Sequence, residues 1–324
     1  MTHKILITRE LPNIVKNTLE RAGHQVFQAD FKAPPTKEQI LELLQKDSYD
    51  ILITLLTDKI DGAVMDAAPN LKLIANYATG FDNINLEDAK TRGIVVTNAP
   101  AIQSAEAVSE HTISLMLALA RKLIPADNFT KAGQYEGWDP MLFIGSNFFG
   151  KTLGLVGTGQ IGKRVAKYAR ALGLKVLYFD VRRDEAFEQE LGVEYRASVE
   201  DLLPEADFVS LHVPLLPSTK HLMNESHFKM MKPSAYLINT SRGPVVDEVA
   251  LEKAVRGGVI AGAALDVYEF EPKITEGLRS LENVILTPHI ASASTEARLE
   301  MAEVVLKNIQ AFTNGELPPN VVNK

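Results

Sequence analysis

Three side chains with complementary chemistry follow three apolar segments in the second half of the chain. Arg242 occurs in NTSRG, Glu271 in ALDVYEFEP and His289 in LTPHIAS. Taken singly, they could be a surface arginine, a solvated acid and a buried core histidine. Open α/β sheets, however, bind ligands at the carboxyl ends of their strands. A guanidinium, a carboxylate and an imidazole at three such ends favour a catalytic set.

This set suits hydride transfer to a 2-oxo acid. Arg242 can bind the substrate carboxylate through its fork of N–H donors. A protonated His289 can give its proton to the carbonyl oxygen as hydride reaches the carbon. Glu271 can hold the imidazole in one tautomer and stabilise its charged form. We therefore expect His289 to be the general acid, and the small residues that follow it to leave room for a cofactor.

A glycine-rich turn predicts where that cofactor binds. The turn follows the apolar strand segment TLGLV and opens a helical segment. In this context the first glycine permits the turn, the second allows close approach of a pyrophosphate and the third allows helix–strand packing. The alternative is a structural turn beside a surface aspartate. The six residues of the turn are Gly157, Thr158, Gly159, Gln160, Ile161 and Gly162.

Asp180 ends the next predicted strand and bears on cofactor choice. A carboxylate there can accept hydrogen bonds from both ribose hydroxyls, and its charge repels the 2′-phosphate of NADP. Arg182 and Arg183 act in the opposite sense, because a guanidinium can pair with that phosphate. We expect NAD(H) to be favoured, with NADP(H) still possible.

Strand and helix patterns alternate along the chain in two series. The first runs from KILIT at the N-terminus to GIVVTN before Pro100, and the second begins at Lys151. Between them lie a long predicted helix over 104–122 and a looser segment over 132–150. Alternation of this kind predicts an α/β protein with two doubly wound parallel sheets in two domains.

The composition bounds the partners and the environment. The 324 residues carry a formal net charge of −7, which argues against nucleic acid or anionic membrane as the main partner. The absence of cysteine excludes disulfides and thiolate metal sites, and we expect no metal. The N-terminal segment lacks the apolar core of a signal peptide, so a cytoplasmic location is expected.

The motifs GTGQIG, NTSRG, ALDVYEFEP and LTPHIAS resemble, in order and spacing, those of the D-isomer-specific 2-hydroxyacid dehydrogenases. The resemblance covers essentially the whole chain. Within that family the sequence is most similar to the glyoxylate and hydroxypyruvate reductases. The segments LLTDKID, NYATGFDNI and GELPPNVVN carry this narrower similarity.

The resemblance implies roles for particular residues. It implies that Arg242, Glu271 and His289 are catalytic, and that Asp266 contacts the nicotinamide carboxamide. The cofactor would also be lined by His289 and by the segment Thr240, Ser241 and Arg242. Backbone N–H groups of Ala78, Thr79 and Gly80 would bind the substrate carboxylate together with Arg242.

The resemblance also implies a domain arrangement. A flavodoxin-like substrate domain would comprise residues 1–99 and 292–324, and a Rossmann dinucleotide domain residues 100–291. Family members resemble one another in being homodimers. The resemblance thus implies that the segment around Trp138 is a dimer arm that reaches toward the partner's active site. The alternative is that Trp138 is a loop aromatic covering the core of its own chain. Asp180 departs from the reductase branch, which often has a small neutral residue there with basic neighbours. That departure puts NADP preference in doubt.

Three other functions remain to be separated. The same family fold serves D-2-hydroxyacid dehydrogenases for bulkier substrates, with which this chain shares its motifs. It also serves formate dehydrogenases, which lack the His–Glu pair present here. A different class, the NAD-sensing corepressors, needs regulatory tails that we do not find in this sequence.

Overall fold

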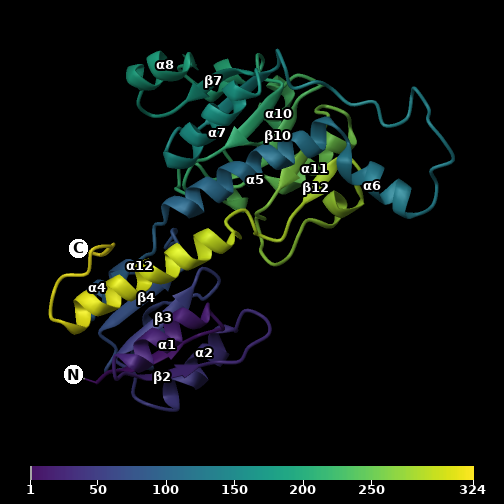
Figure 1. The fold of residues 1–324 in the computed structure, drawn as a ribbon. Coiled ribbons are helices and arrows are strands. Elements are labelled where there is room, and N and C mark those ends of the chain that lie inside the picture. The colour runs from purple at the N-terminus through teal and green to yellow at the C-terminus, as the bar shows by residue number, and fades with distance from the viewer. Residues whose placement is uncertain (1) are drawn as a thin grey trace. The chain divides into compact units, whose positions relative to one another are not determined.

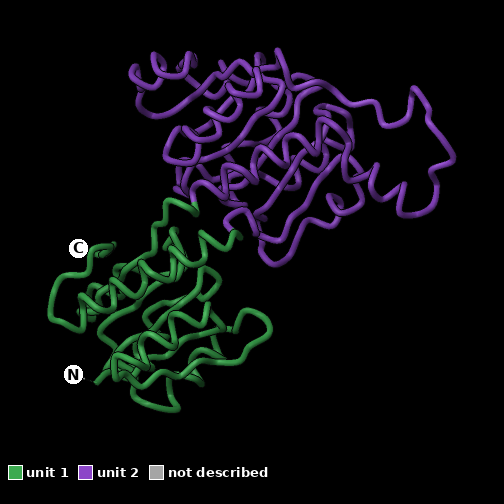
Figure 2. Tube along the Cα trace, in the orientation of Figure 1, with its two compact units in different colours: residues 1–104, 293–324 green, residues 105–292 purple. Residues whose placement is uncertain are grey.

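The protein is described by a computed structural model over residues 2–324. The chain forms two compact units, shown in different colours in Figure 2. Unit 1 comprises the residues up to Ser104 together with Ala293–Lys324, and unit 2 comprises Ala105–Ser292. Unit 1 is therefore built from both ends of the chain, whereas unit 2 is one continuous segment.

Unit 1 contains a five-stranded parallel sheet in the order β2-β1-β3-β4-β5 (Figure 1). This is the strand order of flavodoxin-like folds. Its strands are β1 (Lys4–Ile7), β2 (Gln25–Gln28), β3 (Ile51–Leu55), β4 (Leu73–Tyr77) and β5 (Val95–Thr97). Its helices are α1 (Asn13–Arg21), α2 (Lys37–Gln45), α3 (Gly62–Asp66), α4 (Leu86–Thr91) and α12 (Thr295–Thr313).

Alternating side chains give this sheet two apolar faces. Ile5 and Ile7 of β1 pack on one face with α1 and α12. Leu6, between them, packs on the other face with α2, α3 and α4. The C-terminal helix thus covers a sheet made by N-terminal strands, which explains why both ends of the chain form one unit.

Unit 2 contains a seven-stranded parallel sheet in the order β12-β11-β10-β9-β6-β7-β8. The order reverses at β6, as in a Rossmann fold extended by one strand. Its strands are β6 (Thr152–Val156), β7 (Lys175–Phe179), β8 (Glu194–Tyr195), β9 (Phe208–Leu211), β10 (Tyr236–Asn239), β11 (Gly262–Leu265) and β12 (Val284–Leu286). Its helices are α5 (Ile102–Ala120, which begins in unit 1), α6 (Leu123–Lys131), α7 (Gln160–Ala171), α8 (Glu185–Leu191), α9 (Val199–Leu202), α10 (Glu225–Met230), α11 (Glu248–Arg256) and the 3₁₀ turns η1 (Gly243–Val245) and η2 (Glu276–Ser280).

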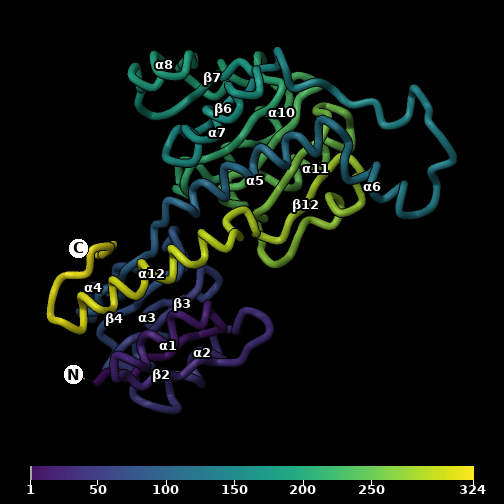
Figure 3. The backbone as a smooth tube through the Cα atoms, viewed as in Figure 1, coloured from purple at the N-terminus to yellow at the C-terminus, as the bar shows by residue number. Residues whose placement is uncertain are grey.

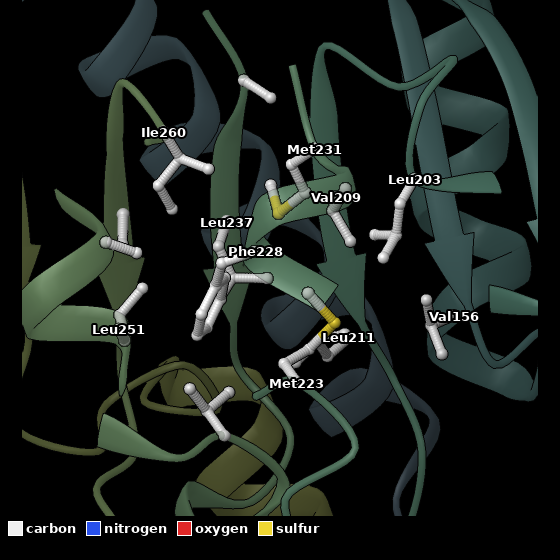
Figure 4. Close-up of a cluster of buried hydrophobic side chains, with 14 of the residues drawn as sticks. Val156, Leu203, Val209, Leu211, Met223, Phe228, Met231, Leu237, Leu251 and Ile260 are labelled. Carbon is white, nitrogen blue, oxygen red and sulfur yellow. The ribbon is translucent and has the colours of Figure 1, made fainter. Parts of the chain in front are cut away.

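Two apolar layers cover the faces of the second sheet. Figure 4 shows part of one, where Leu211 and Leu237 from the strands lie beside Phe228 from α10. The other layer packs α5 and α7 against the opposite face. Burial on both faces explains why these strands read as continuous apolar runs in the sequence.

The predicted fold class of two doubly wound parallel sheets is confirmed. The helix predicted over 104–122 is α5. Strand β8 was not predicted, because two residues at a sheet edge give no periodic signal.

Residues 132–151 contain no helix or strand, and part of this segment extends from unit 2 as an open loop (Figure 3). Its end returns to the core of unit 2, where Phe148 is buried. Trp138 and Met141 in this loop are 83% and 72% exposed. Across residues 2–324, no helix combines the length and the apolar character that crossing a membrane requires.

Candidate active site

The glycine-rich turn lies at the point where the strand order reverses, between β6 and α7. Gly157 has a φ of +94°, which favours glycine. A Cβ on Gly162 would lie 2.2 Å from the Gly157 carbonyl oxygen, so the third glycine lets the helix pack on the turn. A Cβ on Gly159 would meet nothing within 4 Å. The middle glycine thus faces open space at a helix N-terminus, an arrangement that fits a pyrophosphate.

Asp180 follows β7 and bonds this turn. Its Oδ2 atom accepts hydrogen bonds from the Thr158 backbone N–H at 2.7 Å and from Thr158 Oγ1 at 3.0 Å. Within residues 2–324, no donor reaches its other oxygen. One carboxylate oxygen therefore organises the glycine turn, and the second can accept from a ligand hydroxyl.

The two arginines after Asp180 differ in their contacts. Arg183 donates through Nε and Nη2 to Glu188, both at 2.8 Å, and lies over the Tyr195 ring. The hydrogen bond and charge of Glu188 raise the pKa of Arg183. Arg182 is exposed and has no ion pair or hydrogen bond within the described residues. Of these two arginines, only Arg182 could bind a phosphate without first breaking an ion pair.

Arg242 lies in a turn after β10 that the buried Asn239 side chain fixes from beneath. Asn239 Oδ1 accepts from Ser241 N at 3.0 Å, and its Nδ2 donates to the Arg242 carbonyl at 3.0 Å. A Cβ on Gly243 would lie 1.9 Å from the Tyr268 carbonyl group. The residue after Arg242 must therefore be glycine for this turn to pack against the backbone at Tyr268.

Glu271 and His289 form the predicted pair. His289 Nδ1 lies 3.0 Å from Glu271 Oε2, and the side chains are 28% and 30% exposed. Burial alone would raise the pKa of Glu271. The hydrogen bond and charge of His289, the Tyr268 N–H and the charge of Arg242 outweigh burial and lower the pKa of Glu271. Glu271 is thus a carboxylate, and no described residue contacts the other ring nitrogen of His289.

The backbone at His289 is strained and is held on both sides by one buried carboxylate. His289 has a φ of +56°, a conformation that costs a non-glycine residue of order 1–3 kcal/mol. Asp266, which is fully buried, accepts from Thr287 Oγ1 at 2.6 Å. It also accepts from the Ile290 and Ala291 N–H groups at 2.9 and 2.7 Å. The histidine is thereby fixed between two anchored flanks.

Asp266 therefore faces the His289 loop with both of its oxygens. His111 of α5 joins this cluster, with Nε2 3.3 Å from Thr287 Oγ1 and 3.7 Å from Asp266 Oδ1. The contact between Asp266 and a nicotinamide carboxamide stays a prediction.

Thr240 and Ser241 turn their side chains inward. Thr240 Oγ1 lies 2.9 Å from Thr112 Oγ1 of α5, and Ser241 Oγ donates to Asn239 at 2.8 Å. If this segment lines a cofactor, as predicted, its backbone would do so.

Ala78, Thr79 and Gly80 follow β4 in unit 1. The side-chain amides of Asn98 and Asn76 donate to the carbonyls of Thr79 at 2.7 Å and Gly80 at 2.9 Å. Within residues 2–324, the N–H groups of Thr79 and Gly80 have no acceptor. Two donors thus remain for an anion such as a carboxylate. The predicted catalytic residues Arg242, Glu271 and His289 belong to unit 2, and their action on the same substrate as the Thr79 and Gly80 donors stays a prediction.

His212 is a site residue that the sequence analysis missed. It follows β9, and its carbonyl oxygen lies 2.7 Å from where a Cβ on Gly157 would be. Its Nε2 bonds Ser210 Oγ at 2.9 Å, and burial lowers its pKa to about 3, so the ring is neutral. The signal was present, because a histidine and a proline follow an apolar strand at the reversal point.

The chain also matches known proteins. Residues 113–291 match the family described as D-isomer specific 2-hydroxyacid dehydrogenase, NAD binding domain. The glyoxylate reductase of Thermococcus litoralis is 47% identical over 328 residues, which cover 100% of this chain and 98% of that protein. The chain belongs to the D-isomer-specific 2-hydroxyacid dehydrogenase family.

Other relatives of this dehydrogenase agree. The glyoxylate reductase of Korarchaeum cryptofilum is 46% identical, covering 100% of this chain and 97% of that protein. A crystal structure of a Thermus thermophilus protein gives a TM-score of 0.90 at 39% identity, covering 98% and 99% of the two chains. The NADPH-dependent glyoxylate/hydroxypyruvate reductase of Sinorhizobium meliloti, in complex with NADP and malonate, gives 0.84 at 31% identity, covering 99% and 97%.

The predicted family, fold and enzyme class are thus confirmed, and the dehydrogenase uses a nicotinamide cofactor. Within residues 2–324 no group of three or more His, Asp or Glu side chains could hold a metal ion.

Two acids that are close in sequence, Glu269 and Glu271, each pair with a histidine. Glu269, two residues before Glu271, bonds His221, with Oε1 2.6 Å from Nε2. Glu271 alone among the two acids contacts His289. The geometry therefore assigns each acid to its own histidine.

We expect Glu271→Gln to move the pH dependence of reduction. His289 must be protonated to act as an acid, and a carboxylate beside it stabilises the imidazolium. Gln keeps the shape and removes the charge, so reductive kcat/KM should begin to fall at a pH lower by roughly one unit or more. Profiles of kcat/KM from about pH 5 to 9 would measure the shift.

On the acid side, the lowered pKa of Glu271 has its own consequence. The carboxylate stays charged as the pH falls, so wild-type reduction should lose nothing to Glu271 protonation until below a glutamate's usual range. The exposed Glu276→Gln is the matched control and should overlay the wild type. His289→Ala should nearly abolish both directions and leave cofactor binding intact. If the pH profile of Glu271→Gln matched that of the wild type, Glu271 would have no part in proton donation by His289.

Proposed function

We propose that this dehydrogenase reduces a small 2-oxo acid of the glyoxylate or hydroxypyruvate type to the D-2-hydroxy acid with NADH. The His289–Glu271 pair carries the proposal, since it supplies a proton donor with a fixed tautomer. Gly243 packs the Arg242 turn against the loop that carries Glu271. Relatives 46–47% identical over the full chain are glyoxylate reductases.

The proposed reaction uses the chain's groups as follows. Arg242 binds the substrate carboxylate through two parallel N–H donors, and the Thr79 and Gly80 N–H groups add to this anchor. The nicotinamide cofactor, when bound, supplies the hydride. His289 transfers its Nε2 proton to the carbonyl oxygen, and Glu271 stabilises the imidazolium before that transfer. In the oxidative direction neutral His289 takes the proton back.

The domain roles follow from the same proposal. Unit 1, with the Thr79 and Gly80 donors, would bind the substrate, and unit 2, with the glycine turn and Asp180, would bind the dinucleotide. The cytoplasmic location expected from the sequence stays a prediction.

A substrate panel tests the proposal directly. Purified protein with NADH should reduce glyoxylate or hydroxypyruvate with a higher kcat/KM than 2-oxo acids with bulkier side chains. A preference for a bulky 2-oxo acid would establish the alternative dehydrogenase function. NADH binding without turnover of any 2-oxo acid would point instead to a cofactor-sensing role of the corepressor type.

We also propose a homodimer formed through the arm at residues 132–151 and the preceding α6. Apolar side chains exposed together on a soluble surface mark interfaces. Leu123 of α6 is 53% exposed, and the arm residues Tyr135, Trp138, Met141 and Phe149 are 57%, 83%, 72% and 82% exposed. These values argue against Trp138 covering the core of its own chain.

Asp180→Asn tests the cofactor assignment. Asn keeps an oxygen for the Thr158 N–H and removes the charge that repels a 2′-phosphate. Wild type should prefer NADH, and the variant should narrow its NADH/NADPH ratio of kcat/KM by roughly 10-fold. Asp180→Ala also loses the Thr158 bonds and should weaken both cofactors. A wild-type preference for NADPH would show that Asp180 does not face the adenine ribose.

Arg242→Lys tests the carboxylate anchor. Lys keeps the charge and loses the bidentate fork, so kcat/KM for 2-oxo acids should fall by the equivalent of about 3–4 kcal/mol. NADH affinity should change little. Arg279→Lys, on the exposed turn η2, is the matched control and should behave as wild type. Near-wild-type turnover of the Arg242 variant would make Arg242 a structural residue.

The single tryptophan reports on the dimer. Trp138 should emit at shorter wavelength at concentrations where the protein is dimeric and shift to longer wavelength on dilution, because the interface shields its ring. Sedimentation should give a dimer mass over the same range. A monomer that keeps full activity would exclude any catalytic role for the arm.

A further inference from the structure

Glu248, the first residue of α11, is a buried carboxylate that bonds both ends of the loop carrying Glu271. It is 1% exposed. Its Oε1 accepts from Glu269 N at 2.5 Å, and its Oε2 accepts from Thr275 N at 3.1 Å and Thr275 Oγ1 at 2.7 Å. We call residues 268–275 the acid loop. One carboxylate therefore closes this loop at both ends.

Glu269 makes this link reciprocal and connects it to the turn after Arg242. Its Oε2 accepts a long bond, 3.5 Å, from Glu248 N, and its Oε1 bonds His221. His221 in turn donates its backbone N–H to the Pro244 carbonyl at 2.8 Å, and its φ is +51°. Hydrogen bonds thus connect the acid loop, the N-terminus of α11 and the Arg242 turn in one network.

Glu271 has few contacts of its own. Oε1 accepts from Tyr268 N inside the same loop, and Oε2 meets His289. Nothing else in residues 2–324 bonds its side chain. Apart from its bond to His289, the carboxylate is hydrogen-bonded only within its own loop, so the conformation of the loop sets where it lies.

We propose that Glu248 is a positioning residue for the reduction. By closing the acid loop it places Glu271 within hydrogen-bond distance of His289 and so keeps the imidazole in its proton-donating state. The expected kinetic effect rests on the proposed function, whereas the contact between Glu271 and His289 is present in the free protein.

Several charged or titratable groups surround this hydrogen-bond network and contribute to any pH dependence of the reduction. His289 and Arg242 act on Glu271. Tyr268, whose pKa is raised by burial and by nearby carboxylates, faces Asp266, Glu271 and Glu248. His221 faces Glu269. A shift assigned to Glu248 must therefore be shown to pass through Glu271.

A second interpretation is that Glu248 serves only α11. A carboxylate at a helix N-terminus is stabilising through the helix dipole, whatever loop it contacts. Thr275→Val separates the two interpretations. It removes the Oγ1 donor from the loop side, retains the shape and leaves the helix and its carboxylate unchanged.

The experiment compares Glu248→Gln and Thr275→Val, each alone and combined with Glu271→Gln. Gln at 248 can accept from one loop end only and presents an N–H group to the other. Reductive kcat/KM should fall, by up to roughly 100-fold if the misplacement approaches ~1 Å. The fall of reductive kcat/KM at alkaline pH should begin at a lower pH than in the wild type. This shift should be smaller for Thr275→Val than for Glu248→Gln. In the Glu271→Gln background neither change should shift the profile further.

The outcomes separate cleanly. Glu276→Gln, an exposed neighbour on η2, should match the wild type. A lower Tm with an unshifted profile in both single variants would make Glu248 structural only. Shifts of the same size with and without Glu271 would mean that Glu248 acts independently of it. Either result overturns the proposal.

A readout without turnover keeps the inference distinct from the proposed function. The His289 ring can be followed by ¹⁵N NMR against pH in the free protein, assigned by its loss in His289→Ala. Loss of the ring proton should occur at lower pH in Glu248→Gln than in wild type. If this shift is present and no 2-oxo acid is reduced, the proposed function fails and the positioning role stands. If it is absent, the positioning role fails.

Discussion

Parallel strands leave backbone N–H groups without partners where they end, and this chain satisfies them with buried or half-buried side-chain oxygens. Leaving such a donor unsatisfied in the interior costs about 1–3 kcal/mol. In unit 2 these oxygens belong to Asp180, Asn239, Glu248 and Asp266, which hold the glycine turn, the Arg242 turn, the acid loop and the His289 loop. In unit 1, Asp58 accepts from Leu55 N, and burial raises the pKa of Asp58. Each proposed functional residue lies within a few residues of a backbone group that is bonded in this way.

This arrangement explains how a reactive set tolerates strain. His289 has a left-handed backbone, and a strained residue persists only where its surroundings over-determine it. Asp266 provides that by bonding Thr287 on one side and Ile290 and Ala291 on the other. The side chains proposed as catalytic can then remain partly exposed, since buried neighbours set their position. In the proposed reaction, Asp266 thus supports the loop and His289 transfers the proton.

The sequence predicted the elements well and the anchors poorly. Apolar runs broken by glycine and proline revealed the strands of both sheets, and motif spacing placed Arg242, Glu271 and His289 at strand ends. The pairing of Glu269 with His221 rather than His289 depends on how the acid loop folds back on α11, which no local pattern encodes. The donors that bond Asp266 could not be predicted either, because the sequence does not show which donors reach a buried carboxylate. Glu248 was missed for the same reason, whereas His212 was missed although its position after an apolar strand was visible in the sequence.

Native-state hydrogen exchange tests the claim that buried oxygens hold these loops. The N–H groups of Thr158, Glu269, Ile290 and Ala291 bond carboxylates that are buried or half-buried. If the account holds, they exchange in the free protein nearly as slowly as the strand amides, although they lie in loops, and far more slowly than the amides of the exposed arm residues 135–140. Exchange of these four amides at the rate of the arm would contradict it.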